Sequence, residues 1–508
     1  WLHPNGVLPE GNILFAGGSN REGSVRADGL GVLQRLPDSL IADVLALCDG
    51  QSLARCSKVS KVLYVFCQLD YLWRDLVLLR TRGEGISFQQ TWRDTYKHLT
   101  HPSPPCHGSP RPQILLTGFY SQFLFHSWLC AHYEFDDVAP GFLRHEDIPR
   151  VSAKDLTVER FIEDYEIPNR PVIIVDALSE QWPALTSWSE DYLIAHSGAK
   201  PFRARSTAAV MPAHFTMKEY LQYASQVQEE SPLYLFERRF ADVGQLGADY
   251  KIPDYFNPEE FEKQGLAKSK GYDTDLFRLL GERRPDHRWM VVGPRKSGSI
   301  FHVDPNQTNA WNVCVQGRKK WIFYPPDVQP PGVQSSPDGG DVIVPVSIAE
   351  WLINFWSFHQ EARCHKDPSK RPLEAVLHPG EIIFVPHGYW HMVVNLDFSV
   401  ALTHNYVSTS NLFSCLKFLR FKPDQISGVR DHYDGEEVCA ADDFYSFFIE
   451  RLSEYFPFDH PIYSHCMQRI ERLANNSHKE SDVARCSVFG GKGRKGVEGS
   501  EVEGSEVE

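Results

Sequence analysis

Two histidines and one aspartate have the residue types and the spacing of a metal site. His302 and Asp304 are separated by a single residue, and His391 follows later in a Phe-Val-Pro-His-Gly-Tyr-Trp-His segment. On a β-strand, residues i and i+2 point to the same face, so His302 and Asp304 can bind one ion together. Two imidazoles and one carboxylate leave about three positions open on an octahedral ion, which suits non-haem Fe(II) and oxygen chemistry. Zinc more usually takes a closed tetrahedral set, or three ligands and a water.

A lysine between the two histidines adds to this pattern. If Trp321 and Phe323 face the core side of a strand, Lys319 shares that side. A lysine that points into a barrel is costly unless an anion meets it, and the distal carboxylate of 2-oxoglutarate would be such an anion. Thr403 lies on another apolar strand and could offer a hydroxyl to the same carboxylate.

Each of these residues also has a simpler interpretation. A His-x-Asp pair occurs by chance in many proteins, and a lone histidine such as His391 is more often a core residue with its hydrogen bonds satisfied. Lys319 could belong to an exposed basic turn with its neighbours Arg318 and Lys320. The metal-site prediction therefore depends on the conjunction of these residues along the chain.

The composition bounds the class of protein. At 508 residues the chain is too long for one ordinary core, and 42% hydrophobic residues supply a packed interior. The formal net charge of −14 disfavours nucleic acid and anionic membranes as partners, although a local basic groove could still bind RNA, and it favours a basic peptide. Eleven cysteines without a CxxC pair indicate reduced thiols inside the cell, and no apolar run reaches the roughly 20 residues of a membrane helix. Because the first residue is Trp1 rather than methionine, we expect the sequence to be a fragment.

The elements that must position the candidate residues are short strands. Between about residues 288 and 406, β-branched and aromatic runs alternate with Gly and Pro, which is typical of a sandwich or barrel rather than a parallel α/β sheet. The expected strands lie at Trp289–Val292, Trp311–Val315, Lys320–Tyr324, Ile382–Val385, Met392–Asn395 and Val400–Thr403, with an earlier buried strand at Pro171–Val175.

Helical patterns flank this region on both sides. From Leu36 to about Leu79, apolar residues recur at helical intervals, with Pro37 suited to a first turn and Asp49-Gly50 to a break. This segment is therefore predicted to be a compact bundle of short helices. Five prolines between residues 101 and 112 indicate a linker, and residues 411–475 return to helical periodicity.

The strings around the candidate residues resemble the Jumonji-C oxygenases, and within them the branch described as protein arginine demethylases and lysyl 5-hydroxylases. The resemblance extends from about residue 155 to 410, roughly half of the chain. It implies an α+β protein built on a double-stranded β-helix, a cupin-like jelly roll with helical flanks. The most specific strings are His302-Val303-Asp304-Pro305, Ala310-Trp311-Asn312, Val315-Gln316-Gly317-Arg318-Lys319, Pro379-Gly380-Glu381, Phe384-Val385-Pro386 and Trp390-His391.

The resemblance also implies roles for individual side chains. His302, Asp304 and His391 would hold Fe(II). Ser299 would line the pocket near the metal; the family has threonine there, so a hydroxyl is retained. The segment 330–371 is less alike, and its substrate contacts cannot be carried over. The co-substrate 2-oxoglutarate would be contacted by Lys319, Thr403, Asn312 and Tyr234.

The reaction implied by the resemblance is hydroxylation of a C–H bond with O₂, coupled to oxidative decarboxylation of 2-oxoglutarate to succinate and CO₂. On an N-methyl group the product would collapse to formaldehyde and the demethylated amine, whereas on a lysine side chain it would remain an alcohol. We therefore expect a protein oxygenase that hydroxylates lysine or demethylates methyl-arginine or methyl-lysine in histones or other nuclear proteins. The sequence does not choose between these outcomes. A small-molecule hydroxylase and an RNA-modifying oxygenase are weaker alternatives.

The N-terminal bundle resembles an F-box. The resemblance implies docking to the small adaptor subunit of a cullin–RING ubiquitin ligase, whereas a simpler interpretation makes the bundle a brace for the oxygenase domain. The alternative function is thus a ligase substrate receptor whose barrel is mainly a recognition surface. The expected location is intracellular, in the nucleus rather than the cytoplasm. The F-box strings are Leu36-Pro37, Leu40, Val44-Leu45, Cys56-Ser57-Lys58-Val59-Ser60 and Leu72-Trp73.

These patterns predict a division of the chain into consecutive parts. The site residues all fall in the longest part, and the F-box precedes it as a small all-α module. The predicted parts are a flexible lead-in (1–30), the F-box (31–80), a linker and helical connection (81–150), the Jumonji-C oxygenase domain (151–410), a C-terminal helical region (411–480) and a disordered tail (485–508).

Overall fold

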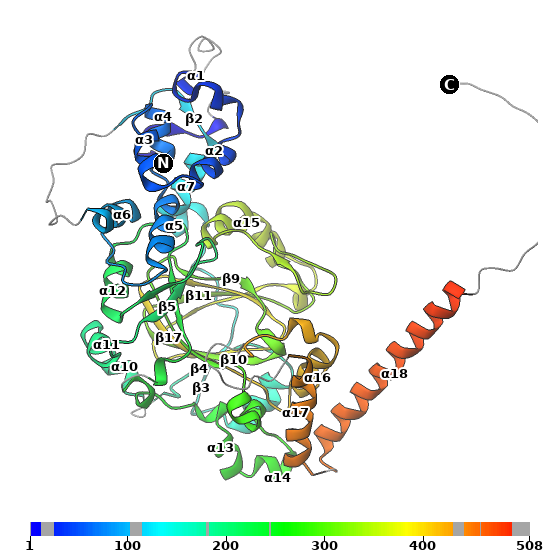
Figure 1. The fold of residues 1–508 in the computed structure, drawn as a ribbon. Coiled ribbons are helices and arrows are strands. Elements are labelled where there is room, and N and C mark those ends of the chain that lie inside the picture. Colours follow the sequence, from blue (N-terminus) through cyan, green and yellow to red (C-terminus); the bar gives the residue numbers. More distant parts are fainter. Residues whose placement is uncertain are drawn as a thin grey trace, which may run out of the picture.

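The protein consists of a β-barrel with helices at both ends (Figure 1). Helices α1 to α4 lie at one end, α5 runs from them towards the barrel, and α16 to α18 lie at the opposite end. In the described residues no helix has the length and apolar character needed to cross a bilayer. The computed structural model describes residues 2–11, 25–101, 114–178, 182–242, 245–429, 441–457 and 459–489.

Two sheets face each other to form the barrel. Within the described chain, one sheet has four antiparallel strands in the order β14-β11-β16-β9, and the other has nine strands whose central four are β15-β10-β17-β8. This arrangement confirms the predicted double-stranded β-helix, because two four-stranded antiparallel sheets pack their apolar inner faces together. The eight strands are β8 (Arg288–Gly293), β9 (Gly298–His302), β10 (Asn309–Gln316), β11 (Lys319–Tyr324), β14 (Leu373–Leu377), β15 (Ile382–Val385), β16 (Trp390–Asn395) and β17 (Ser399–Tyr406).

The larger sheet extends beyond the barrel on both sides. Strands β3 (Arg150–Ser152) and β4 (Val172–Val175) continue it past β15, and the predicted strand at Pro171–Val175 is thereby confirmed. Strands β7 (Tyr234–Glu237), β5 (Phe202–Arg205) and β6 (Ala213–Phe215) continue it past β8.

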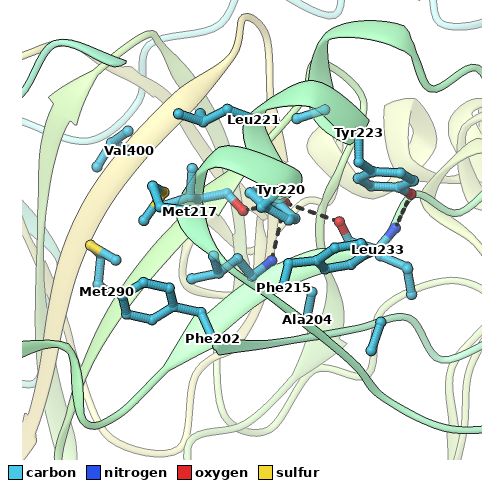
Figure 2. Close-up of a cluster of buried hydrophobic side chains, with 14 of the residues drawn as sticks. Phe202, Ala204, Phe215, Met217, Tyr220, Leu221, Tyr223, Leu233, Met290 and Val400 are labelled. Carbon is cyan, nitrogen blue, oxygen red and sulfur yellow. Dashed lines mark hydrogen bonds between the residues drawn. The ribbon is translucent and has the colours of Figure 1, made fainter. Parts of the chain in front are cut away.

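Helix α12 (Met217–Gln226) covers the extension formed by β5, β6 and β7, and Figure 2 shows the apolar cluster between them. The helix begins with a capping box between Thr216 and Glu219, which satisfies backbone amides at its first turn. The buried Tyr220 hydroxyl donates to the Val292 carbonyl at 2.6 Å and accepts from the Leu235 amide at 3.2 Å. This one side chain therefore fixes β7 against β8.

The N-terminal helices form a bundle with defined caps. The Asp49 carboxylate accepts from the Ser52 amide at the start of α3, and the Ser60 hydroxyl accepts from the Leu63 amide at the start of α4. The break expected at Asp49 is present, since one helix ends before it and the next begins after it. The helices are α1 (Val25–Leu30), α2 (Asp38–Ala46), α3 (Gly50–Cys56), α4 (Lys61–Phe66), α5 (Asp70–Thr81) and α6 (Trp92–Thr100).

Further helices fill the space around the sheets. Helix α15 covers the outer face of the smaller sheet, and α16, α17 and α18 pack together with η7 in a separate apolar cluster. Their bounds are α7 (Gln122–His132), α8 (Phe135–Val138), α9 (Val158–Phe161), η3 (Ile162–Glu166), α10 (Ala184–Ser187), α11 (Glu190–His196), α13 (Pro258–Lys263), α14 (Leu266–Lys270), η7 (Leu276–Arg283), α15 (Ile348–Arg363), α16 (Leu412–Phe421), α17 (Ala441–Tyr455) and α18 (Pro461–Phe489).

The predicted flexible lead-in over residues 1–30 stays a prediction, but two of its described segments contact the rest of the chain. Strand β1 (Val7–Leu8) pairs in parallel with β2 (Phe119–Tyr120), and α1 packs on α4. Val7 is 1% exposed. Its strand partner comes from far along the chain, and local sequence patterns do not reveal such a contact. The proline-rich linker at 101–112 and the tail at 485–508 fall outside the described residues, except for His101 and for residues 485–489 in α18.

A buried ion pair joins the N-terminal helices to the larger sheet. The Arg74 guanidinium on α5 is 3.3 Å from the Glu229 carboxylate, and both side chains are nearly excluded from solvent. Arg74 also donates to the Ala208 carbonyl, and the Trp92 indole donates to Glu229 at 3.4 Å. The helical module and the larger sheet therefore share one apolar core among the described residues.

Substitution of Arg74 by methionine is expected to lower the free energy of unfolding by roughly 3–5 kcal/mol, because it leaves the Glu229 carboxylate buried without its cation. Urea unfolding followed by circular dichroism measures this change. Arg80→Met on the exposed side of the same helix is the control and should have little effect. Equal stability of the two variants would contradict a buried ion pair at this junction.

Candidate metal and co-substrate site

The antiparallel pairing of β9 with β16 brings the metal-site candidates together. His302, the last residue of β9, lies directly opposite His391 on β16. Gly298 makes this pairing sterically feasible: a Cβ there would lie 1.9 Å from the Val393 carbonyl oxygen. The sequence predicted Asp304 to lie within the strand, but the residue lies just beyond the end of it. The Asp304 backbone is still extended, at φ −61° and ψ 142°.

The three side chains converge on one point. The His302 Nε2 atom is 4.0 Å and the His391 Nε2 atom 3.8 Å from Asp304 Oδ1, and all three candidate donor atoms lie within 4.8 Å of one another. A metal with bond lengths of about 2.1 Å can contact two donors up to about 4.2 Å apart, so a single ion fits between each carboxylate–imidazole pair. His391 and Asp304 are largely buried, whereas the His302 side chain is 42% exposed.

Backbone carbonyls orient both imidazoles. His302 Nδ1 is 2.8 Å from the Ile300 carbonyl, and His391 Nδ1 is 3.1 Å from the Tyr389 carbonyl. An Nδ1–H that donates to a carbonyl leaves the Nε2 lone pair free for a metal. Burial also lowers the pKa of His391 well below its usual value, which keeps this imidazole in the neutral form that binds metals.

Lys319 is the second element of the site. Its ammonium is 1% exposed, and it donates to the Tyr234 hydroxyl at 3.0 Å and to the Asn395 amide oxygen at 2.6 Å. Among the described residues no carboxylate lies within ion-pair distance of it. The next residue provides a contrast, since the equally buried Lys320 points to the opposite face and pairs with Glu374 at 3.0 Å. A buried ammonium that has only neutral partners indicates a place for an anionic ligand.

A cavity of about 460 Å³ connects Lys319 with the three metal-site candidates. This volume lies in the range in which proteins bind small organic ligands. The predicted residues Tyr234, Ser299, Asn312 and Thr403 all line it. The buried Oδ1 atom of Asn312 has no hydrogen-bond partner in the described protein, whereas the Thr403 hydroxyl donates to the Trp311 carbonyl at 3.0 Å. The donor set and the unpartnered amide oxygen both fit a polar ligand beside the triad.

Two asparagines at the site were missed by the sequence-based prediction. Asn395 accepts from Lys319, and its amide donates to the Ser297 hydroxyl at 2.9 Å. Asn405 also lines the cavity, and its amide donates to the Thr308 hydroxyl at 2.9 Å. Both could have been found from the period of two, since Asn395 lies on the same strand face as His391 and Asn405 on the same face as Thr403.

Comparison with known protein families agrees with this architecture. A model described as a cupin-like domain matches residues 158–411, and one described as F-box-like matches residues 33–79. The chain therefore belongs to the cupin-like Jumonji-C family and carries an F-box-like region before that domain. The F-box-like match marks the N-terminal helices as a protein-interaction module. The other predicted domain boundaries stay predictions.

Several relatives align with more than half of this chain, and their names describe related enzymes. The arginine-specific demethylase JMJ22 of Arabidopsis thaliana is 42% identical over 431 residues, which cover 84% of this chain and 78% of the relative. The bifunctional arginine demethylase and lysyl-hydroxylase psr-1 of Caenorhabditis elegans is 31% identical over 327 residues, covering 63% of this chain and 72% of the relative. The 2-oxoglutarate and iron-dependent oxygenase JMJD4 of Danio rerio is 27% identical over 291 residues, which cover 54% of this chain and 64% of the relative.

Removal of the His391 imidazole is expected to weaken metal binding by at least about 100-fold, because one of the three candidate protein ligands is lost. Isothermal titration with Mn(II), which resists oxidation better than Fe(II), measures the affinity of wild type and His391→Ala. His387→Ala removes a nearby histidine that is outside the triad and should bind Mn(II) like the wild type. Similar losses in both variants would contradict the assigned ligands.

Proposed function

We propose that this protein is an Fe(II)- and 2-oxoglutarate-dependent oxygenase that hydroxylates lysine or demethylates methyl-arginine or methyl-lysine in other proteins. The observation that carries the proposal is one cavity lined by both a two-histidine, one-aspartate triad and a buried lysine that has no counter-ion among the described residues. The names of the relatives support the choice of protein side chains as substrates. The expected nuclear location remains part of this proposal.

The residues of the chain divide the work between metal and co-substrate. His302, Asp304 and His391 would hold Fe(II) and leave about three positions for other ligands. When bound, Fe(II), O₂ and 2-oxoglutarate supply the oxidant that replaces a C–H bond by C–OH. Lys319 would hold the distal carboxylate of 2-oxoglutarate through a charge-assisted hydrogen bond, with the Tyr234 hydroxyl beside it.

The remaining cavity wall would orient the co-substrate and exclude water. The Asn312 amide and the Thr403 hydroxyl lie on adjacent strands as direct cross-strand neighbours, so both reach the same part of the cavity. Val291, Val393 and Ala310 supply apolar lining between these polar groups. A dry wall strengthens the attraction between Lys319 and a carboxylate, because fewer waters screen it.

Replacement of Lys319 by methionine is expected to lower the affinity for 2-oxoglutarate by about 10- to 100-fold, the range for loss of a hydrogen bond to a charged group. Titration of 2-oxoglutarate against Mn(II)-loaded protein measures the affinity, and succinate release by Fe(II)-loaded protein measures turnover. His302→Ala should abolish turnover. Lys320→Met is the matched control, since it removes the neighbouring buried ammonium and should lower stability while leaving 2-oxoglutarate affinity intact.

Two outcomes would contradict this proposal in different ways. Unchanged affinity in Lys319→Met would remove the assigned role of this residue but not the enzyme class. A wild type that neither binds 2-oxoglutarate nor forms succinate would contradict the oxygenase function, and the ligase-receptor alternative would then lead.

A second function is proposed for the F-box-like helices, namely docking to the adaptor subunit of a cullin–RING ubiquitin ligase. The specific observation is a set of apolar side chains that the bundle leaves in solvent. Leu47 is 88% exposed and Val59 72% exposed, and Leu40 and Val44 are about half exposed. Because large apolar side chains gathered on one small module favour a protein partner, this surface supports the adaptor function.

Substitution of Leu47 and Val59 by aspartate is expected to abolish binding of the purified adaptor subunit, because it places charge in an apolar interface. Size-exclusion chromatography and titration calorimetry measure complex formation. Ile343→Asp, at an exposed apolar residue of the oxygenase half, is the control and should bind normally. A wild type that does not bind the adaptor would leave the module as a brace for the oxygenase domain.

A further inference from the structure

One carboxylate outside the triad lines the cavity. Among the described residues of the cavity wall, the acidic side chains are Asp304, which belongs to the triad, and Glu230. Glu230 precedes Ser231 and Pro232, which also line the cavity and lead directly into β7 and Tyr234. The carboxylate therefore lies on the same wall segment that carries one of the proposed 2-oxoglutarate contacts.

The position of Glu230 is fixed by its neighbour in the chain. The side chain of Glu229 is directed away from the cavity into the junction with the F-box-like helices, where Arg74, Trp92 and Tyr223 contact its carboxylate. Tyr223, which Figure 2 shows in the cluster beneath α12, also accepts from the Leu233 amide at 2.8 Å. These contacts hold the backbone on both sides of Glu230, so its side chain has little freedom to leave the cavity wall.

The Glu230 carboxylate is desolvated, and no lysine or arginine that the structure describes is paired with it. Its Oε1 atom accepts from the Ser347 hydroxyl at 2.8 Å, and Ser347 is itself 3% exposed as the N-cap of α15. Burial raises the pKa of Glu230, and the negative charge of Glu350 raises it further. The Ser347 hydroxyl, His126 and Cys130 lower this pKa. A ligand that brings a positive charge would offset the cost of burying this carboxylate.

The lysines and the arginine that line the cavity do not form ion pairs with Glu230 in the described chain. Lys319 donates to Tyr234 and Asn395. Lys296 lies over the Tyr133 ring, 4.5 Å from its centroid, and is 4.0 Å from the Glu134 carboxylate, while Arg205 forms no ion pair with Glu230 in the described chain. Glu230 is therefore available to a group that enters the cavity from outside.

We propose that Glu230 is a specificity-determining residue that binds the positively charged nitrogen of the substrate side chain, a lysine ammonium or an arginine guanidinium. This inference rests on the proposed oxygenase function and names the chemical feature by which that site selects its substrate. The carboxylate accepts a charge-assisted hydrogen bond from the cation, and the hydrogen bond from the Ser347 hydroxyl holds the carboxylate in position. The partial burial of Glu230 makes this pairing stronger than the same pairing at a surface.

The test compares peptides that differ in one residue. Three fluorescently labelled 12-residue Gly/Ser peptides carry lysine, arginine or norleucine at the centre, and their affinity for Mn(II)- and 2-oxoglutarate-loaded full chain is measured by anisotropy. Wild type is expected to prefer the lysine or arginine peptide over the norleucine peptide by about 10- to 100-fold. Glu230→Gln should remove this preference, and Glu230→Asp should retain part of it, because the charge is kept on a shorter side chain.

Glu350→Gln is the matched control for this experiment. Glu350 is close enough to influence Glu230 electrostatically but does not line the cavity, and the hydrogen bond that its carboxylate accepts from the Val346 amide can be kept by a glutamine oxygen. Equal losses of preference in Glu230→Gln and Glu350→Gln would overturn the inference, because the effect would then be one of long-range charge. Wild type that binds the cationic and norleucine peptides equally, weak binding to both included, would also overturn it.

Measurement of 2-oxoglutarate binding on the same samples separates the two levels of the proposal. Normal 2-oxoglutarate binding without a cation preference would refute the role of Glu230 and leave the oxygenase function standing. Absence of 2-oxoglutarate binding in the wild type would refute the oxygenase function. Normal 2-oxoglutarate binding by Glu230→Gln, together with an unchanged melting temperature, would show that its lost preference is not a folding defect.

Discussion

The register between β9 and β16 is the constraint on which the metal site depends. His302 and His391 come from distant parts of the chain and become neighbours only because these two strands pair with the two histidines opposite each other. A slip of one residue would turn one imidazole to the outer face, since side chains alternate along a strand. The close approach at Gly298 and the pairing of β16 with β11 on its other edge both hold this register. The same pairing with β11 places Lys319 opposite Asn395, so metal site and anion site share one framework.

The two adjacent lysines of β11 show how a binding charge differs from a structural one. Lys320 faces the helix α15 side, where Glu374, in turn contacted by His359 and Arg363, provides its counter-ion. Lys319 faces the cavity, and its partners within the described parts of the chain are the neutral oxygens of Tyr234 and Asn395. Both charges are buried to the same degree, so the cost of desolvation is similar and only the partners differ. The Lys319 ammonium, which has no counter-ion in the described chain, is the charge with which an anionic ligand can pair.

The F-box-like helices are built into the oxygenase rather than tethered to it. Arg74 on α5 reaches Glu229 and the Ala208 carbonyl, and these two contacts lie on the segments before β7 and after β5 that carry cavity residues. The module therefore contributes to the shape of the cavity wall. A protein bound to the exposed face of the module would be held at a fixed distance from the cavity, because the Arg74–Glu229 ion pair and a shared apolar core hold the module against the larger sheet.

The sequence alone predicted the residues of the candidate site, because a period of two on strands and the residue types of the triad are local properties. The strands around His302, Lys319, His391 and Thr403 follow from β-branched and aromatic runs between Gly and Pro, and the caps at Asp49 and Ser60 follow from equally local rules. The tertiary structure decided whatever depends on contacts between distant segments. It paired β1 with β2, it left Lys319 without a counter-ion among the described residues while Lys320 has one, and it turned Glu229 and Glu230 towards different partners. Two consecutive lysines and two consecutive glutamates are equivalent by composition, and only the surroundings that folding assembles give each residue its separate role.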